Sequence, residues 1–179
     1  MRFGPNIGVE GGKTLCMDNQ ALQPQRSCFV MSVGLRGDTR FEEALHAFAP
    51  HCTIVGMDGT LSAHNLNKTK SLDYLHLIPE NFKASTSDQY AGRRADLLKI
   101  DCEGCEYSTV PPWLDAVCTD QIQVEVHKNF MRRPLQRVMD HHQFFARLDR
   151  THRLAYLESN PRWPKICTEY TWVRREPCP

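Results

Sequence analysis

The stretch CFVMSVGLRGD at residues 28–38 decides the fold, because a run of apolar residues leads directly into a turn with two glycines. A second apolar run, TIVGM at residues 53–57, ends on Asp58. A strand, a glycine-bearing turn, a helix and a second strand that ends in an acid form a unit with which many α/β domains hold nucleotide-like ligands. The glycines let the backbone approach the ligand, and the acid accepts hydrogen bonds from ribose hydroxyls. This stretch therefore predicts a β-α-β unit with a ligand site at its strand ends.

The segment between the two runs has the pattern of an amphipathic helix. Thr39 and Glu42 have the spacing of a capping box, in which each side chain bonds a backbone amide of the first turn. Phe41, Leu45 and Phe48 recur at helical spacing, and a proline follows them. We expect a helix that packs this apolar face on the sheet, with a right-handed crossover between two parallel strands.

The rest of the chain alternates between strand-like and helix-like patterns. Further strands are expected in five runs: residues 73–78, 97–100, 121–126, 153–157 and 168–174. Residues 137–148 have the apolar spacing of a helix, whereas residues 85–95 offer at most a stunted crossover helix. A short turn with prolines joins the last two runs, so they should pair as an antiparallel hairpin at the sheet edge. The predicted fold is α/β and Rossmann-like, with a mostly parallel sheet that ends in an antiparallel β-hairpin.

The composition is that of a single globular domain. The chain has 179 residues, of which 41% are hydrophobic and 24% are charged, and its formal net charge is +1. We expect a glycine-rich lid or loop segment at residues 1–27 and the main domain at residues 28–179. The small net charge gives no field for binding nucleic acid, and no apolar run approaches the roughly 20 residues of a membrane span.

The cellular location has two interpretations. The start of the chain lacks the apolar core of a signal peptide, which favours a cytoplasmic location. Eight cysteines and the glycosylation sequon Asn67-Lys68-Thr69 would instead suit a secretory-pathway protein whose targeting segment is absent from this sequence.

A third segment, DLLKIDCEGCE at residues 96–106, points to methyl transfer. In this segment the chain resembles the FkbM-like branch of the S-adenosylmethionine-dependent methyltransferases, which includes methyltransferase-like proteins of animals. That branch typically has lysine, an apolar residue, aspartate, any residue, glutamate, glycine, a small residue and glutamate here, as residues 99–106 do. The resemblance also includes Arg2-Phe3-Gly4, Gly11-Gly12 and the turn at residues 32–38.

The resemblance implies a class I methyltransferase domain with S-adenosylmethionine as cofactor. It further implies O-methylation of an unidentified small-molecule or glycan-like acceptor. The choice of oxygen comes from the resemblance alone, because residue spacing does not distinguish oxygen from nitrogen as the methyl acceptor. The predicted cofactor-binding residues are Ser32, Gly34, Gly37, Asp58, Gly59 and Asp101.

Each of these assignments has a physical reason and a structural alternative. Gly34 leaves room for the aminoacyl part of the cofactor, and Asp58 would accept charge-assisted hydrogen bonds from the ribose hydroxyls. Asp101 follows a central strand, where open α/β sheets bind ligands, and could face the cofactor ammonium or the substrate oxygen. Alternatively, Gly34 and Gly37 serve only a tight turn, and Asp58 is an ordinary residue at the end of a strand.

The predicted catalytic residues are His127 and Asp101. His127 follows the strand at residues 121–126, and imidazole titrates near neutral pH, so it could be the general base that deprotonates a substrate hydroxyl. The alternative is a histidine that is merely hydrogen-bonded at a strand end. Lys99 interrupts an apolar strand, and we expect a structural ion pair between Lys99 and Glu125.

The same segment permits two other chemistries. Cys102 and Cys105 form a C-x-x-C pair, as in thioredoxin-like redox sites, but their glutamate-glycine insert matches the methyltransferase pattern. Zinc is disfavoured because no second cysteine pair has metal-ligand spacing. Asp101, Glu103 and His127 have side chains that suit a divalent ion, but spacing alone does not support one, so no metal is assigned.

Two other functions compete with methyl transfer. Arg36 lies inside the glycine turn and residues 85–95 are compressed, which would suit a degenerate domain that binds a ligand or a partner without turnover. A nicotinamide-dependent oxidoreductase is disfavoured because the turn lacks the full G-x-G-x-x-G spacing.

Overall fold

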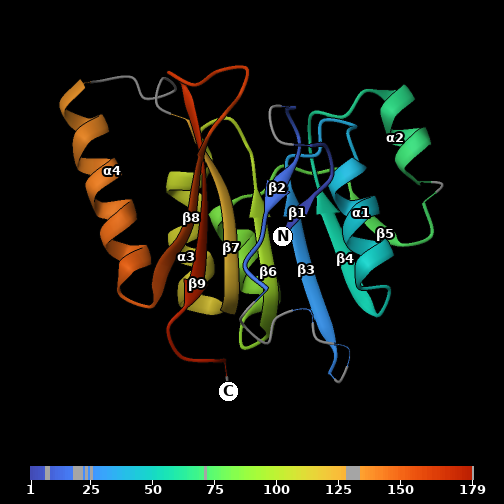
Figure 1. Cartoon of the computed structure of the whole chain (residues 1–179), viewed down its shortest axis with the longest axis horizontal. Helices are drawn as coiled ribbons and strands as arrows, with labels where there is room; N and C mark the ends of the chain where they lie inside the picture. The colour runs from blue at the N-terminus through green and yellow to red at the C-terminus, as the bar shows by residue number, and fades with distance from the viewer. Residues whose placement is uncertain are drawn as a thin grey trace.

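A seven-stranded sheet in the order β5-β4-β3-β6-β7-β9-β8 forms the centre of the computed structural model (Figure 1). Residues 1–6, 9–17, 22, 24, 26–70, 72–127 and 134–178 are described. The parallel strands are β3 (Cys28–Val33), β4 (Cys52–Met57), β5 (Leu75–Ile78), β6 (Arg94–Ile100) and β7 (Cys118–His127). The antiparallel strands are β9 (Cys167–Arg174) and the edge strand β8 (His152–Ser159). The predicted fold class is therefore confirmed, including the terminal hairpin.

The helices follow the expected alternation with two additions, the helices at residues 63–70 and 106–116. Within the described residues the α-helices are α1 (Arg40–Phe48), α2 (Ala63–Lys70), α3 (Glu106–Ala116) and α4 (Pro134–Asp149). The segment between β5 and β6 forms only the 3-10 helix η1 (Ala84–Tyr90), which agrees with the predicted stunted crossover. Helix α2 was not predicted, because its sequence AHNLNKTK has too few apolar residues to show helical periodicity.

The sheet buries apolar side chains on both faces, because alternate residues of a strand point in opposite directions. On one face, Met31 of β3 and Leu98 of β6 belong to a core cluster that includes Trp113 of α3. On the other face, Val30 and Leu97 belong to a second cluster with α1. The strands between these layers are buried on both sides, as expected for continuous apolar runs in a parallel sheet.

The predicted capping box at the start of α1 is wrong. Thr39 makes no side-chain capping bond, and the Glu42 side chain is turned into the protein, where its residue is fully buried. There the hydroxyl of Ser32 donates to Oε1 of Glu42 at 2.5 Å. This bond gives the buried Ser32 hydroxyl and Oε1 of Glu42 a partner in place of the solvent-exposed cap, whereas Oε2 of Glu42 has no hydrogen-bond partner among the described residues.

The N-terminal segment lies against the sheet (Figure 1). Its strands β1 (Arg2–Phe3) and β2 (Lys13–Thr14) pair with each other in a two-stranded sheet. The amide of Cys16 donates to Oε1 of Gln121 at 2.6 Å, so this segment covers a polar face of β7. The alternate residues of that face are all buried: Gln121, Gln123, Glu125 and His127. The predicted division of the chain at residue 27 stays a prediction.

Six cysteines of the described chain form disulfides. These bonds join Cys28 to Cys52 at the starts of β3 and β4, Cys102 to Cys105 after β6, and Cys118 to Cys178. Cys16 and Cys167 are free thiols. Among the described residues, no helix is both long and apolar enough to cross a membrane.

Candidate functional site

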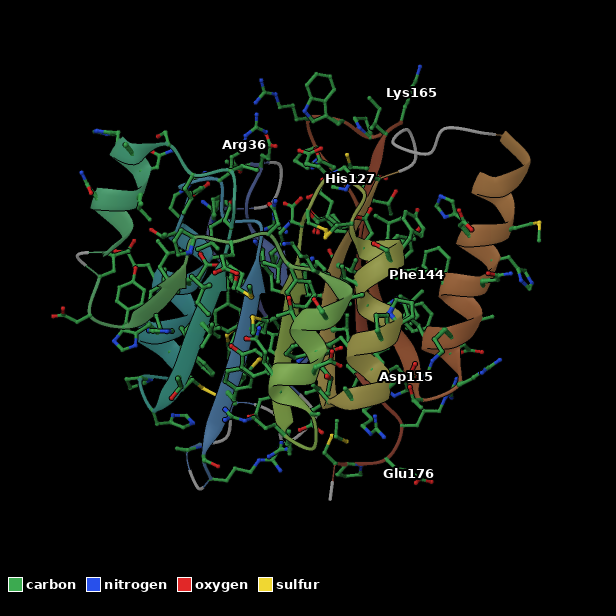
Figure 2. All side chains as sticks on the ribbon, turned by 180° about the vertical axis from the view of Figure 1, so that it is seen from behind. Arg36, Asp115, His127, Phe144, Lys165 and Glu176 are labelled. Carbon is green, nitrogen blue, oxygen red and sulfur yellow. A yellow bond between two sulfur atoms is a disulfide. The ribbon has the colours of Figure 1, made fainter. Side chains whose placement is uncertain are left out.

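A cavity of about 940 Å³ lies at the carboxyl ends of the parallel strands. Each of β3, β4, β6 and β7 contributes a predicted site residue to its lining, which includes Gly34, Asp58, Gly59, Asp101 and His127. Figure 2 shows Arg36 and His127 at the same end of the molecule, with Asp115 and Glu176 at the opposite end. The strand ends therefore bring these five residues together, and their roles in binding and catalysis stay predictions.

Ser32 and Gly37 do not line this cavity. Ser32 is fully buried beneath α1 and is hydrogen-bonded to Glu42. Gly37 lies against α2, where an added Cβ would be 2.5 Å from Nδ2 of Asn65. Both residues therefore shape the turn and its packing.

The turn after β3 brings two backbones unusually close. Gly34 has a φ of +76°, and a Cβ there would lie 1.6 Å from the carbonyl oxygen of Asp101. Its amide donates to the carbonyl of Met57 at 3.0 Å. Arg36 also has a positive φ of 50°, but its side chain is 85% exposed and reaches Glu103 at 3.7 Å. The arginine therefore points to the rim and leaves the turn open.

Asp58 follows β4 directly and accepts hydrogen bonds from two turns. Its Oδ2 accepts a hydrogen bond from the amide of Arg36 at 2.5 Å. Its Oδ1 accepts from both the amide and the hydroxyl of Thr60, each at 2.7 Å. A carboxylate has about four acceptor positions, so about one remains for a ligand. Asp58 thus has the structural role of a residue at a strand end, which was the alternative interpretation, and keeps about one acceptor position for a ligand.

The expected ion pair between Lys99 and Glu125 is wrong. The ammonium of Lys99 donates instead to the carbonyl oxygens of Val33 at 3.2 Å and Gly34 at 3.0 Å. These two carbonyls lie at the end of the adjacent strand β3, so the lysine is held by backbone oxygens of its neighbour.

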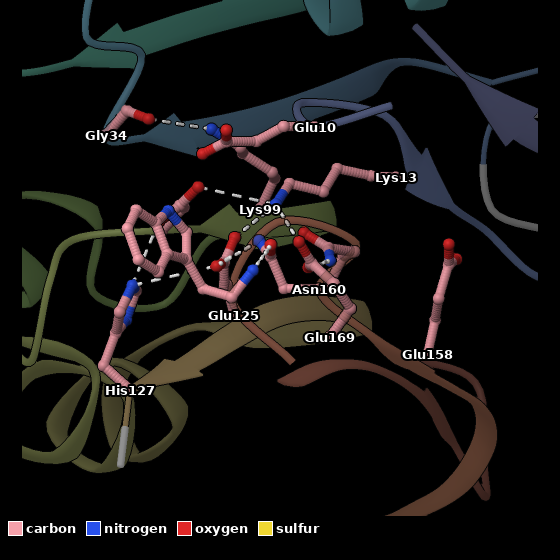
Figure 3. A network of polar contacts seen from close by, with 12 residues as sticks. Glu10, Lys13, Gly34, Lys99, Glu125, His127, Glu158, Asn160 and Glu169 are labelled. Carbon is pink, nitrogen blue, oxygen red and sulfur yellow. Dashed lines mark hydrogen bonds and ion pairs between the residues drawn. The ribbon is translucent and has the colours of Figure 1, made fainter. Parts of the chain in front are cut away.

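Glu125 is paired with Lys13 of the N-terminal segment (Figure 3). Nζ of Lys13 lies 3.0 Å from Glu125, 2.5 Å from Glu169 and 3.4 Å from Asp101. Burial lowers the pKa of Lys13, but the carboxylates of Glu169, Asp101 and Glu125 outweigh it and hold this pKa well above its usual value. Sequence reasoning missed Lys13, because it treated the opening segment as a loop without functional side chains.

The imidazole of His127 is surrounded by carboxylates. Its amide donates to Oε1 of Glu106 at 2.8 Å, and its Nδ1 lies 3.3 Å from the same oxygen. Its Nε2 lies within 3.8 Å of carboxylate oxygens of Glu103, Asp101 and Glu125. Burial alone would lower the pKa of His127, but Glu106, Asp101 and Glu125 raise it to about 9. At neutral pH the imidazole is therefore protonated and cannot accept a proton.

The comparisons with known proteins identify the family. A family model described as a methyltransferase domain matches residues 2–174, and the chain belongs to this family. The cofactor of this family is S-adenosylmethionine. The comparison with curated proteins found no match.

Solved methyltransferase structures share the fold. The fibrillarin pre-rRNA processing protein of Methanococcus jannaschii has a TM-score of 0.62 and 7% identity, covering 92% of this chain and 72% of its own. A putative rRNA methylase from Clostridium thermocellum has a TM-score of 0.55 and 10% identity, with coverages of 84% and 88%. Magnesium protoporphyrin IX methyltransferase from Synechocystis PCC 6803, crystallised with S-adenosylmethionine, has a TM-score of 0.54 and 10% identity, with coverages of 83% and 70%. At these identities the likeness shows the Rossmann-like methyltransferase fold alone.

The cavity has groups that suit each part of S-adenosylmethionine. Asp58 keeps an acceptor position for a hydroxyl, and the main-chain turn at Gly34 lies beside it. The acids Asp101 and Glu103 line the same cavity and suit a positively charged sulfonium or ammonium. Phe82 adds an apolar wall. The residues present therefore fit the cofactor of the family.

Proposed function

We propose that this protein is an FkbM-like methyltransferase that transfers a methyl group to an oxygen of a small-molecule or glycan-like acceptor. The observation that carries the proposal is the convergence of Gly34, Asp58 and Asp101 on one cavity in a chain of the methyltransferase-domain family. S-adenosylmethionine supplies a methyl group already activated by its sulfonium. The protein must therefore mainly hold and align the two reactants.

Each residue of the cavity has a role in this proposal. Asp58 accepts a hydrogen bond from the ribose, and the turn at Gly34 with the nearby Gly59 lets the backbone approach the cofactor. The carboxylate of Asp101, whose side chain is 26% exposed, orients the cofactor ammonium or the acceptor hydroxyl. His127 accepts a proton only in its neutral form, which becomes abundant as the pH approaches 9. Below that pH, Asp101 is the proton acceptor at the cavity.

Ligand-dependent stability tests the cofactor assignment. At 100 times its Kd, S-adenosylhomocysteine should stabilise the folded protein by about 2.7 kcal/mol and thereby raise its unfolding temperature, whereas NAD should not. Asp58→Asn should lose this shift. Asp115→Asn, at the opposite end of the molecule, should keep it (Figure 2). A shift with NAD alone, or an equal shift in both variants, would contradict the proposal.

A domain that binds the cofactor without turnover is the second candidate. Arg36 favours it, because a non-glycine residue with positive φ occupies the turn beside the cofactor position. Transfer of label from methyl-labelled S-adenosylmethionine to candidate acceptors separates the two. Binding without transfer to any hydroxyl compound, sugars included, would support the second candidate.

The disulfides bear on the location. Three disulfides in a chain of this size are typical of oxidising compartments, and Asn67 of the sequon is exposed on α2. We therefore favour the secretory pathway over the cytoplasm. Expression with a secretory leader should give protein whose Asn67 carries a glycan, and a glycan-free product with reduced thiols would contradict this location.

A further inference from the structure

We propose that Glu125, His127 and Cys167 bind a divalent cation of the zinc type in the floor of the cavity. One ligand atom from each residue lies within 4.8 Å of the other two, and all three residues are buried. All three also line the cavity, so the site is open to solutes from that side. The inference concerns metal binding by the chain itself and does not depend on the proposed methyl transfer.

Strand pairing holds the three ligands together. In the antiparallel pair of β7 and β9, His127 is directly opposite Cys167. Glu125 precedes His127 by two residues and therefore points to the same face of β7. Directly opposite residues on one face of such a pair have Cβ atoms about 5 Å apart. The ligand geometry is thus fixed by the sheet backbone and not by a flexible loop.

Further residues orient two of these ligands. Glu106 is fully buried and engages the amide and Nδ1 of His127, which directs Nε2 toward Glu125 at 3.8 Å. A carboxylate on the far nitrogen of a histidine is the common arrangement in metal sites. Nδ2 of Asn160 donates to Oε1 of Glu125 at 2.9 Å (Figure 3). Lys13 contacts Oε2 of Glu125, so Oε1 is the oxygen on the side of His127.

The charge around the site favours a cation. The ammonium of Lys13 faces three carboxylates, those of Asp101, Glu125 and Glu169. His127 faces Glu103 and Glu106 as well as Asp101 and Glu125, so even when His127 carries a proton, two positive charges face five carboxylates and a negative excess remains. A divalent cation between Glu125 and His127 would offset this excess.

The ligand types select the metal. Thiolate, imidazole and carboxylate together suit zinc, whereas magnesium and calcium prefer oxygen ligands alone. Three protein ligands leave the fourth tetrahedral position for water or a solute from the cavity. Among the described residues, Cys28, His51 and Cys52 form another such group, but the disulfide between Cys28 and Cys52 occupies both sulfurs.

A cobalt titration of the metal-stripped, disulfide-bonded chain tests the inference. We expect one equivalent of Co²⁺ to produce a thiolate-to-cobalt charge-transfer band, and Zn²⁺ to displace it. Cys167→Ser should abolish the band, and His127→Gln should weaken Co²⁺ binding by at least about tenfold. Cys16→Ser and His51→Gln are the matched controls and should bind as the unmodified chain does.

A third variant guards against loss of folding. Glu106→Gln keeps the three ligands and should lower the affinity for Co²⁺ by about tenfold or more, because it changes the orientation of the imidazole. Thermal unfolding of each variant verifies that it is folded before titration. Absence of stoichiometric binding, a band that persists in Cys167→Ser, or a loss confined to His51→Gln would overturn the inference. No cofactor is present in these measurements, so their outcome is independent of methyl transfer.

Discussion

Replacing Gly34 by alanine tests whether the close approach of two backbones builds the cavity. Gly92→Ala is the matched control, because Gly92 has nearly the same φ, 74° against 76°, and an added Cβ would meet no atom within 4 Å. Alanine in the left-handed region costs about 1 kcal/mol at either position. The difference between the two variants therefore isolates the contact at Gly34.

The size of that difference follows from the geometry. A Cβ added at Gly34 would lie 1.6 Å from the carbonyl oxygen of Asp101, whereas real Cβ contacts are at least 3.0 Å. The backbones of β3 and β6 must separate at this point, which strains the bond from the amide of Asp101 to the carbonyl of Val33 at 3.1 Å. Overpacking of this kind costs about 1–3 kcal/mol. We expect Gly34→Ala to lose about 2 kcal/mol more than Gly92→Ala.

Urea unfolding and calorimetric titration measure the two consequences. A difference of about 2 kcal/mol corresponds to roughly 4–8 °C in Tm for a domain of this size. Gly34→Ala should also weaken binding of S-adenosylhomocysteine, since Asp101 is displaced, and Gly92→Ala should not. Equal free energies of unfolding for the two variants would refute the reasoning, because only one of them has the clash.

Three further perturbations address the buried charges and a disulfide. In metal-free protein, the pKa of His127 is raised from 6.5 to about 9, so its stabilisation is full below pH 6.5 and is lost as the pH rises through 9. Urea unfolding from pH 6 to 10 should show this loss, and His127→Gln should remove it; an unchanged profile would contradict the pKa. The double variant Cys118→Ser, Cys178→Ser opens a link of 60 residues and should lose about 4 kcal/mol of stability by urea unfolding, whereas a loss near zero would contradict the entropic account. Lys13→Met should cost about 3–5 kcal/mol in the same assay, partly restored by Glu169→Gln; a neutral Lys13→Met would show that the ammonium stabilises nothing.

The fold could be predicted because its strands are continuous apolar runs. β3 and β4 are parallel strands buried on both faces, so their sequences show this environment directly. The α2 helix could not be predicted, because its sequence has no apolar face to reveal it. The prediction for Glu42 was wrong for a different reason. Its spacing from Thr39 matches a capping box, but its side chain accepts a hydrogen bond from Ser32 of β3 instead. Local patterns predict an element, but tertiary contacts decide where its polar side chains go.

The candidate site was predictable to the extent that it lies at strand ends. Asp58 and Asp101 follow buried strands directly, so locating the strands also located these acids. Lys13 gave no such signal, because its carboxylate partners are 88 to 156 residues away in the chain. The pKa of His127 depends on Glu106 of the preceding helix α3, on Asp101 after β6 and on Glu125 of its own strand. The chemistry of the imidazole was therefore unreadable from its position in the sequence.

Lys13 connects the N-terminal segment to strands β7 and β9 beneath the cavity. The register of β7 and β9 places Glu125 directly opposite Glu169, and like charges in such positions destabilise a sheet. Lys13 contacts both carboxylates and is itself buried. The two glutamates therefore need the ammonium to offset their repulsion, and the buried ammonium needs the glutamates as partners. Glu10, three residues earlier, lines the cavity. The N-terminal segment therefore supplies part of the cavity wall through Glu10 and, through Lys13, offsets part of the negative charge of Glu125 and Glu169.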